Sequence, residues 1–181
     1  MTNKNLINDI VKLFKNKKYE EVILKTEKNF NIDSCPPGLI NLCAISKLLK
    51  ANNTKDDIFS ALNELEIFYK KSEKKSEKIE AVSNYIVTCV VNSGKYTEIL
   101  KYFKIAETLF EQCEAEFGYN EKLYSRGADL YKYTLDINKS RRILEQLIKN
   151  KTKSKITACA HGYMSNYTYD WGLKEYFEYS K

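Results

Sequence analysis

Large apolar residues return at helical spacing along most of this chain of 181 residues, in paired stretches separated by short polar turns. In the first pair, one apolar stripe begins at Leu6 and a second at Tyr19, with the polar sequence KNKK between them. The sequence DSCPPG ends this pair, because two prolines and a glycine cannot continue a helix. The pattern predicts a helical hairpin over residues 4–31.

The same arrangement occurs three more times and predicts hairpins over residues 38–69, 79–116 and 121–150. The residues that open the second helix of each hairpin are separated by 36, 41 and 42 positions, and they are Tyr19, Lys55, Tyr96 and Asn138. Helical-hairpin repeats have units of about 34 to 47 residues. One hairpin cannot bury its apolar face alone, so we expect a single all-α domain in which neighbouring hairpins stack.

The charged sequence KKSEKKSEK, residues 70–78, contains no apolar residue and no helix breaker. It could prolong the helices on either side, but we interpret it as a solvated connector between the second and third hairpins.

Composition supports a helical protein and limits the classes of partner. Apolar residues make up 43% and charged residues 30% of the chain, with only two prolines and six glycines. The net charge is +6, but the lysines are spread among 24 acidic residues, whereas a nucleic-acid site needs a clustered basic face. We therefore expect no dedicated nucleic-acid site, and keep a basic helical nucleic-acid binder as the third of three functional hypotheses.

The cysteines and the absence of targeting signals suggest the cytoplasm. The five cysteines are far apart and never form C-x-x-C, which argues for a reducing compartment. No apolar run is long enough to span a bilayer, and the first residues lack the apolar stretch of a secretory signal. We expect a cytoplasmic protein that does not bind membranes.

Signatures of catalysis are also lacking in the sequence. There is no phosphate-binding G-x-x-x-x-G-K-[ST] or G-x-G-x-x-G motif, and one histidine cannot supply an H-E-x-x-H metal site. Cys159 and His161 could activate a thiolate, but residues two apart on a helix do not face each other. We expect no enzymatic activity, no cofactor and no metal.

Around Gly94, the turn of the third hairpin, the sequence resembles a tetratricopeptide repeat. The positions that match the large, small and aromatic sites of that motif are Ile86, Val87, Val90, Tyr96, Ile99, Phe103 and Ala106. The first hairpin matches more loosely, through Tyr19, Val22 and Phe30, and the others share only the hairpin and its spacing. The resemblance implies a right-handed α-α superhelix of about four antiparallel hairpins with a C-terminal capping helix.

In that family the first helix of each hairpin lines a concave, peptide-binding face. The resemblance therefore implies a partner-binding groove with contributions from Lys47, Asn84, Thr88, Tyr124 and Tyr131. Tyr124 and Tyr131 are seven residues apart, so they could equally be core residues of one helix. The leading functional hypothesis is a non-catalytic scaffold that binds a peptide or protein segment on this face.

The C-terminal segment, residues 154–181, carries the only tryptophan, Trp171, and several tyrosines. We expect it to cap the last hairpin, as terminal repeats require. Its sequence YDWGLKEYFEYSK also resembles the linker that precedes the catalytic lobes in bacterial proteins similar to O-GlcNAc transferase. That likeness implies the second hypothesis, a substrate-recruiting part of a glycosyltransferase-like protein without its catalytic lobes.

Overall fold

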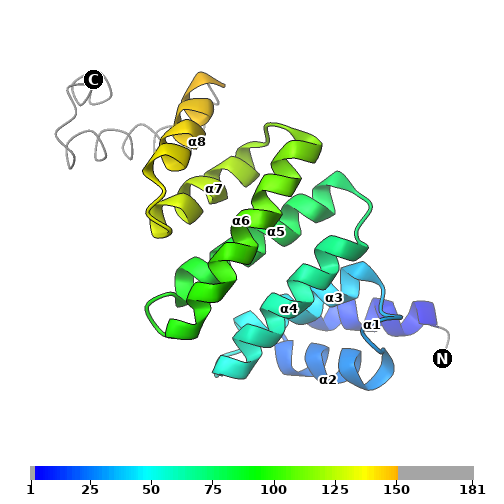
Figure 1. The fold of residues 1–181 in the computed structure, drawn as a ribbon. Helices are drawn as coiled ribbons and strands as arrows, with labels where there is room; N and C mark the ends of the chain where they lie inside the picture. Colours follow the sequence, from blue (N-terminus) through cyan, green and yellow to red (C-terminus); the bar gives the residue numbers. More distant parts are fainter. Residues whose placement is uncertain (1–2, 151–181) are drawn as a thin grey trace. The chain divides into compact units, whose positions relative to one another are not determined.

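The computed structural model describes residues 3–150 as helices joined by short turns (Figure 1). Within this range there is no β-strand, and the prediction of an all-α fold is confirmed. The chain divides into two compact units, the first ending at Thr97 and the second beginning at Glu98. The predicted cap over residues 154–181, together with Cys159, His161 and Trp171, lies outside the described residues.

The first unit contains five helices, and their bounds are α1 (Asn3–Lys15), α2 (Tyr19–Asn29), α3 (Pro37–Leu49), α4 (Lys55–Lys71) and α5 (Lys75–Asn92). Each helix packs against the next along the chain, and α1 also contacts α3. The pairs α1–α2 and α3–α4 correspond to the first two predicted hairpins. The core between them is apolar, with Ile10, Val22 and Leu62 fully buried.

Local sequence explains where α3 and α4 begin. Pro37 starts α3, where a missing backbone N–H is tolerated. At the start of α4, Asp57 N donates to Thr54 Oγ1 (3.3 Å) and Thr54 N donates to the Asp57 carboxylate (2.7 Å). This reciprocal capping box satisfies two backbone donors that the helix itself cannot.

The predicted connector over residues 70–78 is mostly helical, so our interpretation of it was wrong. Helix α4 continues to Lys71 and α5 begins at Lys75. No proline or glycine interrupts this stretch, and Lys70 and Lys74 pair with Glu66 and Glu77 one turn away. Such pairs favour a helix, so the residues extend the flanking helices.

The second unit contains three described helices, α6 (Leu100–Phe117), α7 (Glu121–Tyr133) and α8 (Ile137–Lys149). Helix α7 packs against both α6 and α8. Gly118 ends α6 with a positive φ of 66°, a conformation that glycine adopts without strain. Asn120 and Asp136 then cap α7 and α8 through their side-chain oxygens.

The boundary between the two units falls inside the third predicted hairpin, 79–116, whose helices would be α5 and α6. A short 3-10 turn, η1 (Thr97–Ile99), lies at this boundary. The single array and its superhelical twist therefore stay predictions.

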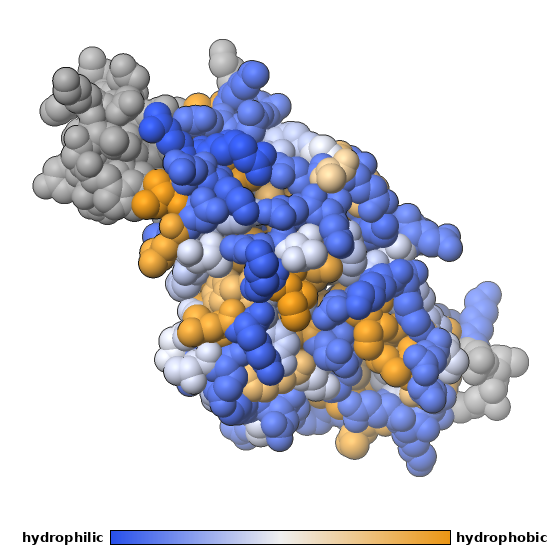
Figure 2. All heavy atoms as spheres, viewed as in Figure 1, coloured by the Kyte–Doolittle hydropathy of each residue, from blue (hydrophilic) through white to orange (hydrophobic). Residues whose placement is uncertain are grey.

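Hydrophilic side chains cover much of the surface in Figure 2, with smaller apolar groups between them. None of the described helices has both the length and the apolar content to cross a bilayer.

Candidate binding pocket between α3 and α5

Helix α3, with the sequence PGLINLCAISKLL, is apolar on almost every side. Its contacts with α1, α2 and α4 bury Leu39, Ile40, Cys43 and Ala44. Another side of α3 faces α5, and near the beginnings of these two helices Asn41 Nδ2 donates to Glu80 Oε1 (3.2 Å). Helix α3 therefore has apolar surface that its contacts with α1, α2 and α4 do not cover.

Toward the ends of α3 and α5 lies a pocket of about 380 Å³, entirely within the first unit. Its apolar lining consists of Ile45, Leu48, Leu49, Val87 and Val91. Its polar lining consists of Asn53, Asn84, Thr88, Asn92 and Lys95. An apolar wall with a few polar groups is the usual composition of a ligand site.

Two of the apolar lining residues are largely accessible to solvent. Leu49, at the end of α3, is 51% exposed, and Val91, in the last turn of α5, is 63% exposed. Single exposed apolar side chains are ordinary, but these two line one pocket from two different helices. The pocket therefore offers accessible apolar surface to a partner.

Some polar side chains of the pocket already form hydrogen bonds within the protein, and one does not. Thr88 Oγ1 donates to Asn84 O (2.8 Å), and Asn92 Nδ2 donates to Thr88 O (2.8 Å). Asn53 Nδ2 donates to Leu48 O (3.0 Å). The half-buried side-chain amide of Asn84 makes no hydrogen bond to any residue that the structure describes. Asn84 can therefore both donate to and accept from a bound molecule.

Of the five residues predicted to line a groove, the structure brings Asn84 and Thr88 together in this pocket. Lys47 lies elsewhere on α3 and is only 5% exposed. Its ammonium donates to Glu27 Oε1 (2.8 Å), to Glu64 Oε1 and to Ser60 Oγ (2.9 Å). The expected exposure of Lys47 is therefore corrected, because its side chain joins α2, α3 and α4 from inside the unit.

Burial alone would lower the pKa of Lys47, but its hydrogen bonds to Glu27 and Glu64 outweigh burial and raise that pKa above its usual value. Glu27, Cys43 and Glu64 also bring three possible metal-ligand atoms within 4.8 Å of one another. The Lys47 ammonium already bonds both carboxylates, and burial, with the Glu64 charge, raises the pKa of Cys43 to about 12. The contacts of this cluster are those of an internal ion pair, with a protonated thiol beside it.

Tyr124 and Tyr131 are core residues of the second unit, which is the other interpretation that their spacing allowed. They are 6% and 0% exposed, and both rings pack against Phe110 on α6. The Tyr124 hydroxyl donates to Glu114 Oε1 (2.6 Å), and Arg142 on α8 forms two hydrogen bonds to the same carboxylate (2.8 and 2.9 Å). The tyrosine hydroxyls thus reach polar partners on α6 without facing a groove.

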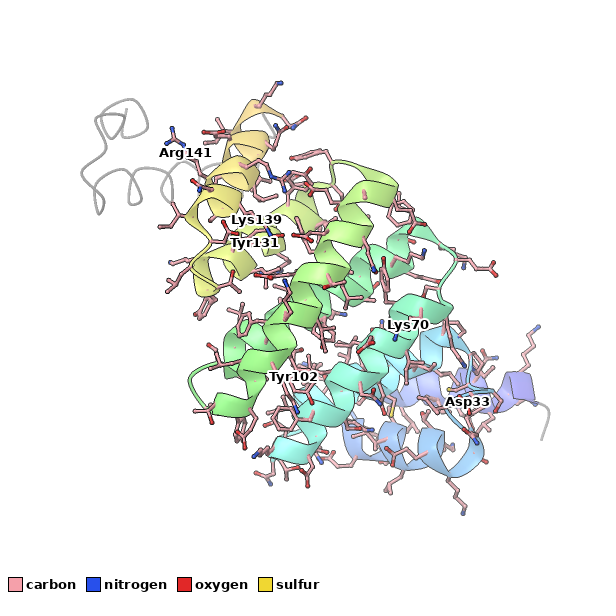
Figure 3. All side chains as sticks on the ribbon, viewed as in Figure 1. Asp33, Lys70, Tyr102, Tyr131, Lys139 and Arg141 are labelled. Atoms are coloured by element: carbon pink, nitrogen blue, oxygen red, sulfur yellow. The ribbon has the colours of Figure 1, made fainter. Side chains whose placement is uncertain are left out.

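The second tyrosine, seven residues further along α7, makes a similar arrangement. Tyr131 donates to Glu111 Oε1 (3.4 Å), which also accepts from Lys139 Nζ (2.8 Å). The Lys139 ammonium lies 5.1 Å from the centre of the Tyr131 ring, and Figure 3 labels both residues. Together the two networks link α6, α7 and α8.

These networks predict a stability loss in acid. Burial opposes ionisation of Glu114, but hydrogen bonds from Arg142 and Tyr124 outweigh it and lower its pKa. Glu114 therefore stabilises the fold above its unfolded pKa of about 4.3, and this stabilisation disappears as pH falls through the lower folded pKa. We expect Arg142→Gln to lower the free energy of unfolding by about 1 kcal/mol at pH 7.

Urea unfolding of wild type and Arg142→Gln, followed by circular dichroism from pH 7 to pH 3, measures this difference. The two proteins should converge as Glu114 becomes protonated in both. Arg141, whose guanidinium pairs with Glu145 on the same helix, provides the control Arg141→Gln, with a smaller effect. A stability difference for Arg142→Gln that stays constant down to pH 3 would contradict the predicted role of Glu114.

The wall of the pocket includes residues that the sequence analysis did not single out. Ile45, Leu48 and Leu49 were assigned only to a helix, although the apolar character of α3 on all sides was a signal of a second apolar contact. Lys95 was placed only in a turn. Its role at the pocket depends on how the end of α5 lies beside α3, which the local sequence does not specify.

Searches of this chain against family models, curated proteins and solved structures gave no match in any of the three comparisons. The likeness to tetratricopeptide repeats and to the glycosyltransferase linker therefore stays a prediction.

Proposed function

We propose that this chain is a non-catalytic interaction module that binds a peptide or protein segment in the pocket between α3 and α5. The observation that carries the proposal is the pocket of about 380 Å³, with an accessible apolar wall and the free amide of Asn84. Peptide recognition by helical surfaces uses apolar side-chain pockets together with a few polar groups.

The chemistry of the lining favours binding over catalysis. Of the ten lining residues, only Lys95 is ionisable. General acid–base chemistry and nucleophilic catalysis usually need a titratable pair or an activated nucleophile within hydrogen-bond reach. The Thr88 hydroxyl donates to a backbone carbonyl, so the described pocket offers it no base.

The dimensions of the pocket suit a short piece of extended chain. A sphere of 380 Å³ is about 9 Å across, which an extended peptide crosses in about three residues. One aliphatic side chain can contact Leu48, Leu49 and Val91, while the amide of Asn84 bonds an adjacent peptide group. A peptide thereby satisfies both the apolar wall and the free polar group.

A displayed library of random heptapeptides, selected on the full chain, tests this proposal. We expect enriched peptides to bind the double variant Leu49→Gln/Val91→Gln at least about tenfold more weakly than wild type, because each substitution removes apolar contact area. Fluorescence polarisation with the enriched peptides gives the dissociation constants.

The matched control is Leu24→Gln/Leu135→Gln, which changes two other exposed leucines, 68% and 80% accessible, that do not line the pocket. This control should retain wild-type affinity. Peptides that bind both double variants as tightly as wild type would overturn the assignment of the pocket as the binding site.

A further inference from the structure

Lys95 is the single charged residue of the pocket lining, and its position is fixed by the end of α5. Its backbone N–H donates to Asn92 O (3.0 Å), three residues back, in the turn that follows the helix. The residue is exposed, and its ammonium forms no ion pair, hydrogen bond or ring contact with any residue in the described range. The pocket therefore presents one positive charge that this part of the chain does not neutralise.

Other lysines of α3 and its end are paired within the unit. Lys47 lies between Glu27 and Glu64, and Lys50 Nζ is 2.7 Å from Asp57 Oδ2. Carboxylates on α2 and α4 thus pair with both of these lysines. The first unit supplies none to the pocket, whose lining contains no aspartate or glutamate.

The ends of α3 and α5 carry partial negative charge, which could by itself explain a nearby lysine. However, several of the last carbonyls of these helices already accept hydrogen bonds. Leu48 O accepts from Asn53 Nδ2, Val90 O from Ser93 Oγ (2.8 Å), and Asn92 O from the backbone N–H groups of Lys95 and Tyr96. These carbonyls bond to groups other than the Lys95 ammonium, which remains available to a partner.

We infer that the partner is an acidic peptide segment in which an aliphatic side chain fills the pocket and a nearby aspartate or glutamate pairs with Lys95. This inference rests on the proposed function and names the chemistry of its ligand. Because an extended chain crosses the pocket in about three residues, the carboxylate lies within about three residues of the aliphatic side chain. The net charge of +6 favours the encounter with an acidic segment.

Charge reversal at one residue tests the inference. The random heptapeptide library is selected separately on wild type and on Lys95→Glu. Wild type should enrich an aliphatic residue with aspartate or glutamate within three positions, and Lys95→Glu should enrich the same aliphatic residue with lysine or arginine instead. The acidic peptides should bind Lys95→Glu about tenfold more weakly than wild type, and their affinity should fall with salt.

The control Lys28→Glu makes the same change of charge on the exposed end of α2, away from the pocket. It should leave the selected sequences unchanged, which separates local pairing from the effect of net charge. Circular dichroism of both variants verifies that the helices are intact.

The possible outcomes distinguish this inference from the proposed function. Peptides that depend on Leu49 and Val91 but show no acidic preference, or the same preference on Lys95→Glu, would overturn the inference and leave the binding function intact. A selection that yields no peptide dependent on Leu49 and Val91 overturns both. An equal loss of affinity in Lys28→Glu would assign the acidic preference to net charge and would also overturn the role of Lys95.

Discussion

Replacing Lys47 by methionine is expected to destabilise the first unit by about 3 to 5 kcal/mol at pH 7, because it leaves the buried Glu64 carboxylate without a countercharge. Glu64 is 8% exposed, and its Oε2 atom has no hydrogen-bond partner among the described residues. Methionine preserves most of the aliphatic length of lysine, so the loss reports the missing ammonium more than a cavity.

The pH dependence of Lys47→Met distinguishes an unpaired charge from poor packing. Burial raises the pKa of Glu64 even while Lys47 bonds to it, and without the ammonium that pKa rises further above the unfolded value of about 4.3. Such a carboxyl is best tolerated in its protonated form. The deficit relative to wild type should be smallest near pH 4 and should grow as pH rises through the raised folded pKa. A deficit that is the same at pH 5 and pH 8 would indicate a packing defect.

Hydrogen exchange measured by mass spectrometry, with urea unfolding of the full chain, gives the required local readout. Amides of α2, α3 and α4 should lose protection in Lys47→Met, and the double variant Lys47→Met/Glu64→Leu should recover much of it because no charge remains buried there. Lys70→Met is the control, since Lys70, labelled in Figure 3, is an exposed residue whose pair with Glu66 is on the surface. Equal effects of Lys47→Met and Lys70→Met would contradict the buried role of Lys47.

The buried position of Lys47 could not be predicted from the sequence, although the helices could. The helices of the described residues were predictable because each buries a face, and burial leaves a periodic apolar pattern in the sequence. Lys47 is a charged residue within such a helix, and its partners Glu27 and Glu64 come from two other helices. The local pattern contains no information on that pairing, so the lysine was assigned to an exposed groove.

The tyrosines and the pocket residues differ in how well their positions could be predicted from the sequence. Tyr124 and Tyr131 have apolar rings and polar hydroxyls, so their sequence pattern fits a core or a groove equally well. The packing of both rings on Phe110 and the hydrogen bonds of their hydroxyls to Glu114 and Glu111 place them in the core. In contrast, the resemblance to a tetratricopeptide repeat assigned Asn84 and Thr88 to one surface, and both do line the pocket because residues four apart share one face of α5.

The second large loss of stability is expected when Gly127, in the middle of α7, is replaced by alanine. A Cβ atom at this position would lie 2.6 Å from Phe110 Cζ and closer still to Cε2. The Phe110 ring is fully buried and packs against Tyr124 and Tyr131, with centroid distances of 6.1 and 5.6 Å. Because these neighbours enclose the ring, we expect α7 or α6 to shift to accommodate a Cβ atom.

Gly127→Ala is expected to lower the free energy of unfolding of the second unit by about 1 to 2 kcal/mol. Overpacking of a core costs about 1 to 3 kcal/mol. The better helix propensity of alanine offsets up to about 1 kcal/mol of that loss. Urea unfolding and hydrogen exchange of amides in α6, α7 and α8 measure the effect.

Two further variants make this prediction specific to the contact with Phe110. Gly38→Ala is the matched control, because a Cβ at Gly38 in α3 meets nothing within 4 Å; that variant should be as stable as wild type or slightly more stable. Phe110→Leu removes the ring atoms nearest Gly127, so adding it to Gly127→Ala should destabilise less than the sum of the two single changes, by about 1 kcal/mol or more. If the losses of stability in the two single variants simply add in the double variant, the Phe110 ring does not require a glycine at position 127.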